Sequence, residues 1–256
     1  MMLTSNGEVP LAKIQEVLRT DAAFTADVLR LANSPLLGAR VTIRSVLHAV
    51  TLLGLERIKS LATTLALKVF LRNTTHSEAT EACWRHNLAV AVICEKIAPH
   101  YNIDSDVCYT ASLLHDIGRL ALLRACPERY DGVFSLVWDP NEDLLLCEQS
   151  LLGVDHCQAG KWILEHWEFP EEFCEVALLH HTAPGPEASD LLRSVHAGSQ
   201  IADLLGYPAI KHPPLVEASV VASFLPESYR RRFEEHFDIF SEEVAFRING
   251  IECALL

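Results

Sequence analysis

Apolar residues recur along the chain at intervals of three and four, the spacing that places them on one face of an α-helix. Four segments with this pattern fill the N-terminal part of the chain: 11–20, 25–34, 45–54 and 55–72. Ser45 stands where an N-cap residue is expected, and Gly54 stands where the third segment would end. No run in this part alternates between apolar and polar residues as a half-buried β-strand does, so the pattern predicts an all-α protein.

The pattern is interrupted by the polar stretch 73–81, which contains no apolar residue larger than alanine. Thr75 and Glu78 have the spacing of a capping box for the helix that follows. Beyond this break we predict helices over 78–98, 104–123, 142–150, 155–167, 170–182 and 187–205. The later stretch 224–244 is charged and amphipathic, and it suits packing or contact with a partner. We therefore divide the chain into residues 1–74, 75–225 and 226–256, the last a helical tail that packs on the rest.

Composition and charge exclude several classes of protein. The 256 residues carry a net charge of −13, which opposes non-specific binding to nucleic acid or to an anionic membrane. No run approaches the roughly 18 uncharged apolar residues of a membrane span, and the N-terminus lacks the basic and apolar regions of a secretory signal. The eight cysteines form no CxxC pair and mostly fall within helical apolar patterns. These features predict a cytoplasmic protein with buried free thiols that binds neither DNA nor membrane.

Five histidines and two aspartates fall on the apolar faces or at the ends of five predicted helices: His86, His115, Asp116, His156, His180, His181 and Asp203. A single histidine on an apolar face is usually a hydrogen-bonded core residue, and an aspartate near a helix end is usually a cap or a solvated charge. Burying many such groups separately is costly, whereas a divalent metal site satisfies them together. The pattern therefore favours a metal site over a set of unrelated core residues.

The make-up of this set bears on which metal it would hold. Its seven nitrogen and oxygen ligands exceed the number that one tetrahedral zinc ion takes, and they suit two ions roughly 3.5–4 Å apart, as in two-metal hydrolases. The neighbours His115 and Asp116 can place two ligands side by side, and a carboxylate can bridge two ions. Imidazole and carboxylate ligands suit iron, manganese or zinc better than calcium. Cys157, next to His156, is the one thiol near this set in the sequence.

Several stretches of the sequence resemble a known family. The run "LLHDIGRLAL", which contains His115 and Asp116, resembles the HD motif of metal-dependent phosphohydrolases. The stretches "FTADVLRLANSPLLG", "SVLHAVTLLGLERIKSLA" and "HWEFPEEFCEVALLHH" resemble HDOD domains, the HD-related output domains of bacterial signalling proteins. The resemblance implies an HD-domain-like helical bundle with an additional N-terminal helical lobe. Residues 1–74 would form that lobe, and residues 75–225 would form the HD-like metal-binding lobe.

The resemblance also implies roles for individual residues. One ion would be held by His86, His115, Asp116 and Asp203, and Asp116 would bridge to a second ion held by His156, His180 and His181. This set resembles the ligands of the HD-GYP phosphodiesterase branch, but the chain reads "HHTAPGPEASD" where that branch has its GYP loop. Arg119 stands where that branch has lysine, and its guanidinium could clamp a phosphate. Asp116 and Arg119 are therefore the candidate catalytic residues.

Two functions are compatible with these features. In the first, the chain is a signal-transduction output domain, of the kind found in response regulators, that hydrolyses phosphoesters or nucleotides with its metal ions. In the second, it is a catalytically silent signalling module whose metal or ligand site is structural or regulatory. The implied partners are signalling proteins with receiver, GGDEF or EAL modules, or a phosphorylated small molecule. An open coordination position with a cleft for substrate would favour the hydrolase.

Overall fold

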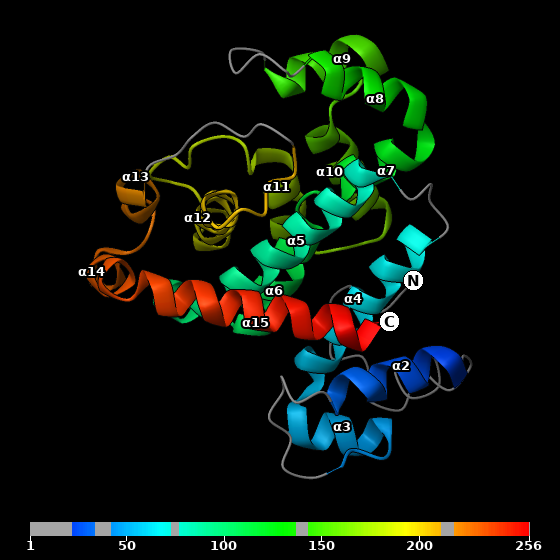
Figure 1. The fold of residues 1–256 in the computed structure, drawn as a ribbon, viewed down its shortest axis with the longest axis vertical. Helices are drawn as coiled ribbons and strands as arrows, with labels where there is room; N and C mark the ends of the chain where they lie inside the picture. The colour runs from blue at the N-terminus through cyan, green and yellow to red at the C-terminus, as the bar shows by residue number, and fades with distance from the viewer. Residues whose placement is uncertain (1–21, 34–41, 73–76, 137–142, 211–217, 256) are drawn as a thin grey trace.

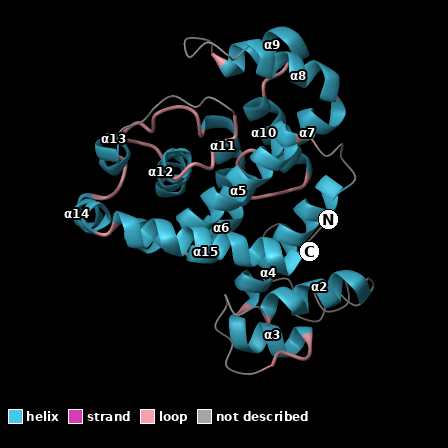
Figure 2. Ribbon diagram, viewed as in Figure 1, coloured by secondary structure: helices cyan, strands magenta, loops and turns pink. Residues whose placement is uncertain are grey.

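The computed structural model describes residues 22–33, 42–72, 77–136, 143–210 and 218–255. Within these ranges the chain is built from helices and contains no strand, which confirms the predicted all-α fold (Figure 2). The amphipathic segment predicted over 11–20 lies outside the described residues. No helix in the described ranges is long and apolar enough to cross a membrane.

The described residues of the N-terminal part form three helices, drawn in blue to cyan in Figure 1. They are α2 Ala22–Ala32, α3 Val46–Leu53 and α4 Leu55–Arg72. The side chain of Ser45 accepts a hydrogen bond from the backbone N–H of His48 and caps α3, as predicted. Gly54 separates α3 from α4 at a φ of +85°, where a residue with a Cβ would be strained. The chain therefore turns sharply between these two helices, and α4 continues toward α6.

The long helix α5, Glu78–Ile97, runs through the middle of the molecule (Figure 1). Most of its side chains are buried, because α6, α7, α12 and α15 pack around it. Its N-cap is Ser77, whose hydroxyl accepts from the backbone N–H of Thr80. Glu78 is therefore the first residue of the helix rather than its third, and the cap differs from the predicted Thr75, which lies outside the described residues.

The helix predicted over 104–123 is two helices, α6 Ser105–Leu114 and α7 Ile117–Ala125. The break falls at His115 and Asp116, both of which are buried. Asp116 has φ −109° and ψ 25°, outside the helical region, and its side chain does not cap α7. The apolar periodicity continues across the break, so the sequence pattern does not reveal it. As a result these two side chains enter the core from a helix junction.

The remaining helices complete the bundle. They are η2 Ala98–Tyr101, α8 Pro127–Leu136, α9 Leu144–Leu152, α10 His156–His166, α11 Glu171–Leu179, α12 Asp190–Leu204, α13 Ala218–Ser223, α14 Glu227–Glu235 and α15 Phe237–Leu255. Helix α8 is not among the predicted helices. The charged stretch 224–244 contributes to two helices, α14 and α15, which are separated at His236.

A network of charged side chains ties the N-terminal and C-terminal helices to α5. Arg57 of α4 contacts Glu95 of α5 at 2.5 Å and Asp106 of α6 at 3.0 Å. Arg247 of α15 contacts the other oxygen of Glu95 at 2.6 Å. Helix α15 packs against both α5 and α2. The division of the chain into 1–74, 75–225 and 226–256 remains a prediction, and all three parts meet at this central helix.

Close packing of α7 against α10 shapes one side of the site. A Cβ at Gly118 of α7 would lie 2.0 Å from the carbonyl oxygen of His156 and 2.4 Å from the backbone nitrogen of Gly160. Only a residue without a side chain permits this approach. The contact therefore brings His156 next to Asp116 and Arg119, which lie on either side of Gly118 in the sequence.

Candidate metal centre

The seven predicted ligands come from separate parts of the fold and lie in one cluster. Their positions are α5 for His86, the α6–α7 junction for His115 and Asp116, the start of α10 for His156, the end of α11 for His180 and His181, and α12 for Asp203. Neighbouring imidazole rings in the cluster have centroids between 4.3 and 5.5 Å apart. Asp203 Oδ1 lies 3.6 Å from His86 Nδ1. The structure thus places all seven side chains together.

Three of these histidines are oriented by main-chain carbonyl groups, which accept hydrogen bonds from their Nδ1 atoms. The pairs are His86 with Tyr207 at 2.8 Å, His115 with Ser112 at 2.6 Å and His180 with Ala177 at 3.0 Å. A carbonyl oxygen can only accept, so Nδ1 carries the proton in each ring. In a neutral imidazole Nε2 then has the lone pair. This is the arrangement that a metal-ligating histidine adopts, with its other nitrogen held by a protein acceptor.

Three buried lone-pair atoms in the cluster have no hydrogen-bond partner in the described part of the structure. They are His115 Nε2, His180 Nε2 and Asp116 Oδ1. Asp116 Oδ1 lies 4.0 Å from His180 Nε2, which does not exceed twice the length of a metal–ligand bond of roughly 2.0–2.2 Å. Buried acceptors without a donor are rare and costly. A cation held between these atoms would satisfy all three.

Burial and neighbouring charges set the protonation of these groups. Burial lowers the pKa of His86 and of His115, and it holds the pKa of His180 well below its usual range. Burial alone would raise the pKa of Asp116, but the charge of Arg119 and the nearby histidines outweigh it and hold that pKa well below its usual range. Neutral imidazoles beside an ionised carboxylate are the protonation states that bind a divalent transition metal.

Arg119 lies inside the cluster, where it is only 2 % exposed. Its Nε donates to Asp116 Oδ2 at 2.6 Å. Its Nη2 lies 3.1 Å from His156 Nε2 and 3.3 Å from His181 Nε2. Its Nη1 is buried without a hydrogen-bond partner in the described residues. The guanidinium therefore contacts three of the seven predicted ligands.

Glu148 of α9 belongs to the cluster although the sequence does not single it out. Its Oε2 accepts from the ring Nδ1 of His156 at 2.6 Å and from the backbone N–H of the same residue at 2.7 Å. Its Oε1 accepts from the hydroxyl of Tyr130. These bonds place the lone pair of His156 on Nε2. Acidic residues on helices are mostly exposed, so the predicted helix over 142–150 contains no signal for this role.

Cys157 offers a different combination of ligands. Its Sγ and one ring nitrogen from each of His156, His180 and His181 lie within 4.8 Å of one another, so this group could hold a metal ion. Burial raises the pKa of the Cys157 thiol, which is therefore protonated at neutral pH. In this combination the thiol would take a place that the sequence predicts for Asp116.

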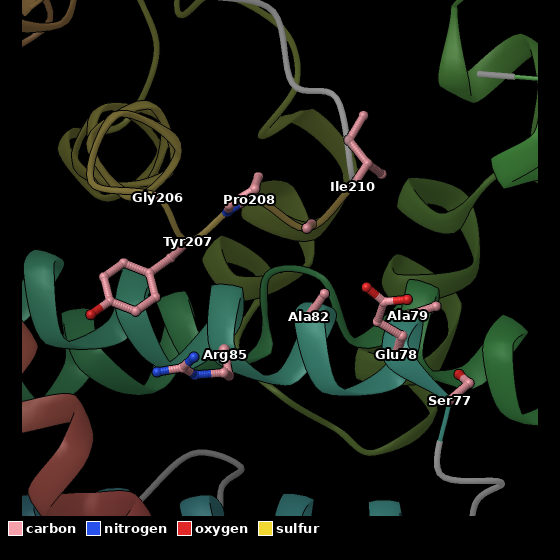
Figure 3. A pocket seen from close by; sticks show the side chains of 10 residues that line it. Ser77, Glu78, Ala79, Ala82, Arg85, Gly206, Tyr207, Pro208 and Ile210 are labelled. Atoms are coloured by element: carbon pink, nitrogen blue, oxygen red, sulfur yellow. The ribbon is translucent and has the colours of Figure 1, made fainter. Parts of the chain in front are cut away.

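The cluster is buried except at one edge and beside one pocket. His181 is exposed, whereas His115, His156 and His180 are buried. A pocket of about 410 Å³ lies between the N-terminal half of α5 and the loop that follows α12 (Figure 3). Tyr207 lines this pocket, and its carbonyl oxygen is the one that holds His86. The pocket therefore adjoins the His86 side of the cluster.

Solved structures of similar fold come from several bacteria. An HDOD domain protein of unknown function from Geobacter sulfurreducens is 23 % identical, with a TM-score of 0.80 over 96 % of this chain and 88 % of that protein. A protein from Shewanella amazonensis SB2B, provisionally named a phosphohydrolase, is 21 % identical, with a TM-score of 0.72 over 95 % of this chain and 89 % of that protein. The MmoQ response regulator from Methylococcus capsulatus is 27 % identical, with a TM-score of 0.51 over 88 % of this chain and 90 % of that protein.

Comparison with protein families gives the clearest relationship. The HDOD domain family matches residues 1–183, which include six of the seven clustered residues and leave out Asp203. A comparison with curated proteins gives no match. The family match covers well over half of the chain and agrees with the resemblance of its sequence motifs, so the chain belongs to the HDOD domain family.

Proposed function

We propose that this HDOD domain is a bacterial signalling output domain that holds a divalent metal ion. The ion would be bound by His115, Asp116 and His180, with His86 and Asp203 completing the site. The observation that carries this proposal is the set of three buried lone-pair atoms, His115 Nε2, His180 Nε2 and Asp116 Oδ1, that have no donor in the described residues.

A metal ion satisfies these atoms better than the other candidates do. All three are acceptors, so they cannot bond to one another. Protonating the rings would supply donors, but burial lowers the pKa of both His115 and His180 and opposes it. A water molecule has two hydrogens for three acceptors, whereas a cation accepts all three lone pairs. Two imidazoles and a carboxylate suit iron, manganese or zinc.

A signalling role is supported by the family and by the MmoQ response regulator, which shares the fold at 27 % identity. The partners would then be signalling proteins, among them those with receiver, GGDEF or EAL modules, and the ligand a phosphorylated small molecule. The exposed His181 edge is the part of the site that such a ligand could reach, and the pocket lined by Tyr207 lies beside the site.

Phosphoester hydrolysis is a second candidate function. It is favoured by Nη1 of Arg119, which has no hydrogen-bond partner within the described residues. A bound ion would supply a Lewis acid that polarises a phosphoryl oxygen. Arg119 would donate from Nη1 to another phosphoryl oxygen while its Nε stays on Asp116. Phosphomonoesters and nucleotides are the substrates to screen. Chelator-sensitive turnover that falls in Arg119→Gln at unchanged metal content would support this role, and ligand binding without turnover would favour the silent module.

Elemental analysis of protein purified without chelator or nickel tests the metal site. We expect about one equivalent or more of iron, manganese or zinc in the wild type and its loss in His180→Ala. His236→Ala is the matched control, because His236 is an exposed histidine at the C-terminal end of α14 and is not one of the clustered residues. This variant should keep the metal. A folded wild type that contains no metal and also refuses added manganese and zinc would contradict the proposal.

A further inference from the structure

We infer that Arg119 is the second cation of this centre, so that the chain holds one divalent ion where the sequence predicts two. The inference rests on the metal site proposed above and concerns its stoichiometry. The predicted second ion needs Asp116 as a bridge, together with His156, His180 and His181. The guanidinium of Arg119 contacts three of these four residues and is 2 % exposed.

The lone pair of His156 accepts a hydrogen bond from Arg119. Its Nδ1 donates to Glu148 at 2.6 Å, which leaves Nε2 as the only ring nitrogen that can offer a lone pair. That atom lies 3.1 Å from Arg119 Nη2, which can only donate. A metal ion could bind His156 there only after the guanidinium had moved away.

His181 is engaged in the same way. Its Nε2 lies 2.9 Å from His156 Nε2 and 3.3 Å from Arg119 Nη2. If His181 Nε2 carries a proton, it donates to His156 and has no lone pair for a metal. If it carries none, its lone pair accepts from Arg119. Neither protonation state leaves His181 Nε2 as a metal ligand while Arg119 is in place.

Asp116 offers one oxygen to a metal rather than two. Its Oδ2 accepts from Arg119 Nε at 2.6 Å and lies 3.9 Å from the thiol of Cys83. Its Oδ1 has no hydrogen-bond partner in the described residues and lies 3.4 Å from His156 Nε2 and 4.0 Å from His180 Nε2. This division of the carboxylate suits a terminal ligand to one ion on the Oδ1 side, with the guanidinium on the Oδ2 side.

The charges of the cluster balance with one ion. When ionised, Asp116, Glu148 and Asp203 carry three negative charges, and Arg119 with one divalent ion carries three positive charges. A second divalent ion would leave two positive charges uncompensated among buried side chains, which is costly. A centre with one ion and one guanidinium also lacks the pair of metals that clamps both oxygens of an in-line displacement.

Manganese binding to the metal-free full chain tests this inference. Thiols bind Mn²⁺ weakly, so the number of ions bound per chain reports on the nitrogen and oxygen ligands. Equilibrium dialysis followed by elemental analysis should give one equivalent, with the electron paramagnetic resonance spectrum of an isolated ion. Two equivalents with a spectrum of magnetically coupled ions would overturn the inference and leave the metal site standing. No binding at all would refute the metal site itself, so the two failures are distinguishable.

Variants then test whether Arg119 is the cause. Arg119→Gln removes the charge and should raise the count from one equivalent to two, whereas Arg119→Lys keeps a charge and should stay at one. A folded Arg119→Gln protein that still binds one equivalent would overturn the inference. If Arg119→Gln does not fold, His181→Ala is the second test, because His181 is exposed, unlike the other three histidines around Arg119 and Asp116. It should keep the wild-type count of one, and a lower count would show that His181 is a ligand.

Discussion

Glu148 and His156 are joined twice: one carboxylate oxygen accepts both the ring Nδ1–H and the backbone N–H of the histidine, at 2.6 and 2.7 Å. Both side chains are fully buried. Burial would raise the pKa of Glu148, but the hydrogen bond from His156 and the charges nearby outweigh it and lower that pKa. The ionised carboxylate of Glu148 therefore lies beside Nδ1 of His156, and the guanidinium of Arg119 lies beside Nε2 of the same ring.

This arrangement predicts that Glu148→Gln destabilises the protein. The amide keeps the shape of the side chain but removes the charge that offsets Arg119, so we expect the free energy of unfolding to fall by about 1–3 kcal/mol. Urea unfolding followed by circular dichroism measures the change. Tyr130→Phe is the matched control, since it removes one hydroxyl donor and keeps the charge, and it should cost only about 0.5–1.5 kcal/mol. A Glu148→Gln variant as stable as wild type would show that the carboxylate charge has no structural role.

The close approach of α7 and α10 predicts a large effect from one added methyl group. A Cβ at Gly118 would meet backbone atoms 2.0 and 2.4 Å away, which cannot move without separating the helices. We expect Gly118→Ala to lower the free energy of unfolding by about 3 kcal/mol and to lower metal content, because a shift of α7 would displace the ligand Asp116 at its start. Gly185→Ala is the control: nothing lies within 4 Å of its Cβ, so its effect should stay within about 0.5 kcal/mol. Equal stability of the two variants would contradict the packing argument.

The sequence predicts much of the fold, because helical periodicity and capping are local properties. Ser45 caps α3, as its position in the sequence indicates, and Asp155 at the start of the segment predicted over 155–167 caps α10. The break at His115 and Asp116 is not predictable in this way, since the apolar spacing continues through it. Pro170 is likewise the residue before α11 rather than its first residue. Such differences of one or two residues arise where tertiary contacts decide how the helix ends.

The sequence predicts that the selected side chains lie close together, and it predicts much less about their contacts with one another. Histidines in apolar helical stripes are unusual enough to stand out, and the structure places all of the selected ones together. Glu148 gives no such signal, because an acidic residue on a helix is ordinarily solvated. The position of Arg119 also depends on three-dimensional packing. Its sequence position suggests a phosphate clamp, whereas its Nε and Nη2 are engaged with Asp116, His156 and His181.

The neutral histidines predict how stability depends on pH. Burial lowers the folded-state pKa of His86, His115 and His180, while in the unfolded chain each titrates near about 6.5. Between these values the unfolded chain binds more protons. Without metal, the free energy of unfolding should therefore fall as the pH drops below about 6.5, by up to about 1.4 kcal/mol per pH unit for each ring. Urea unfolding in chelator at pH 7.5, 6.5 and 5.5 measures this. A stability that rises toward pH 5.5 would contradict the neutral state of the rings.

Asp116 should matter for both stability and metal binding. Asp116→Asn keeps the size of the side chain but leaves the buried charge of Arg119 unpaired, which should cost about 3–5 kcal/mol. The same change should abolish metal binding, since it neutralises the carboxylate ligand. Asp155→Asn is the matched control, because Asp155 caps α10 next to the cluster and asparagine caps a helix equally well. Metal content retained in a folded Asp116→Asn protein would remove Asp116 from the ligand set.

The most direct test of the metal centre is anomalous X-ray diffraction from crystals of the protein loaded with manganese or zinc. We expect one strong peak, at roughly 2.0–2.2 Å from His115 Nε2, His180 Nε2 and Asp116 Oδ1, with the guanidinium of Arg119 still bonded to Asp116. A crystal of the metal-loaded protein with no peak between these three atoms would contradict the account, and their missing partners would then have to be donors from the protein or solvent.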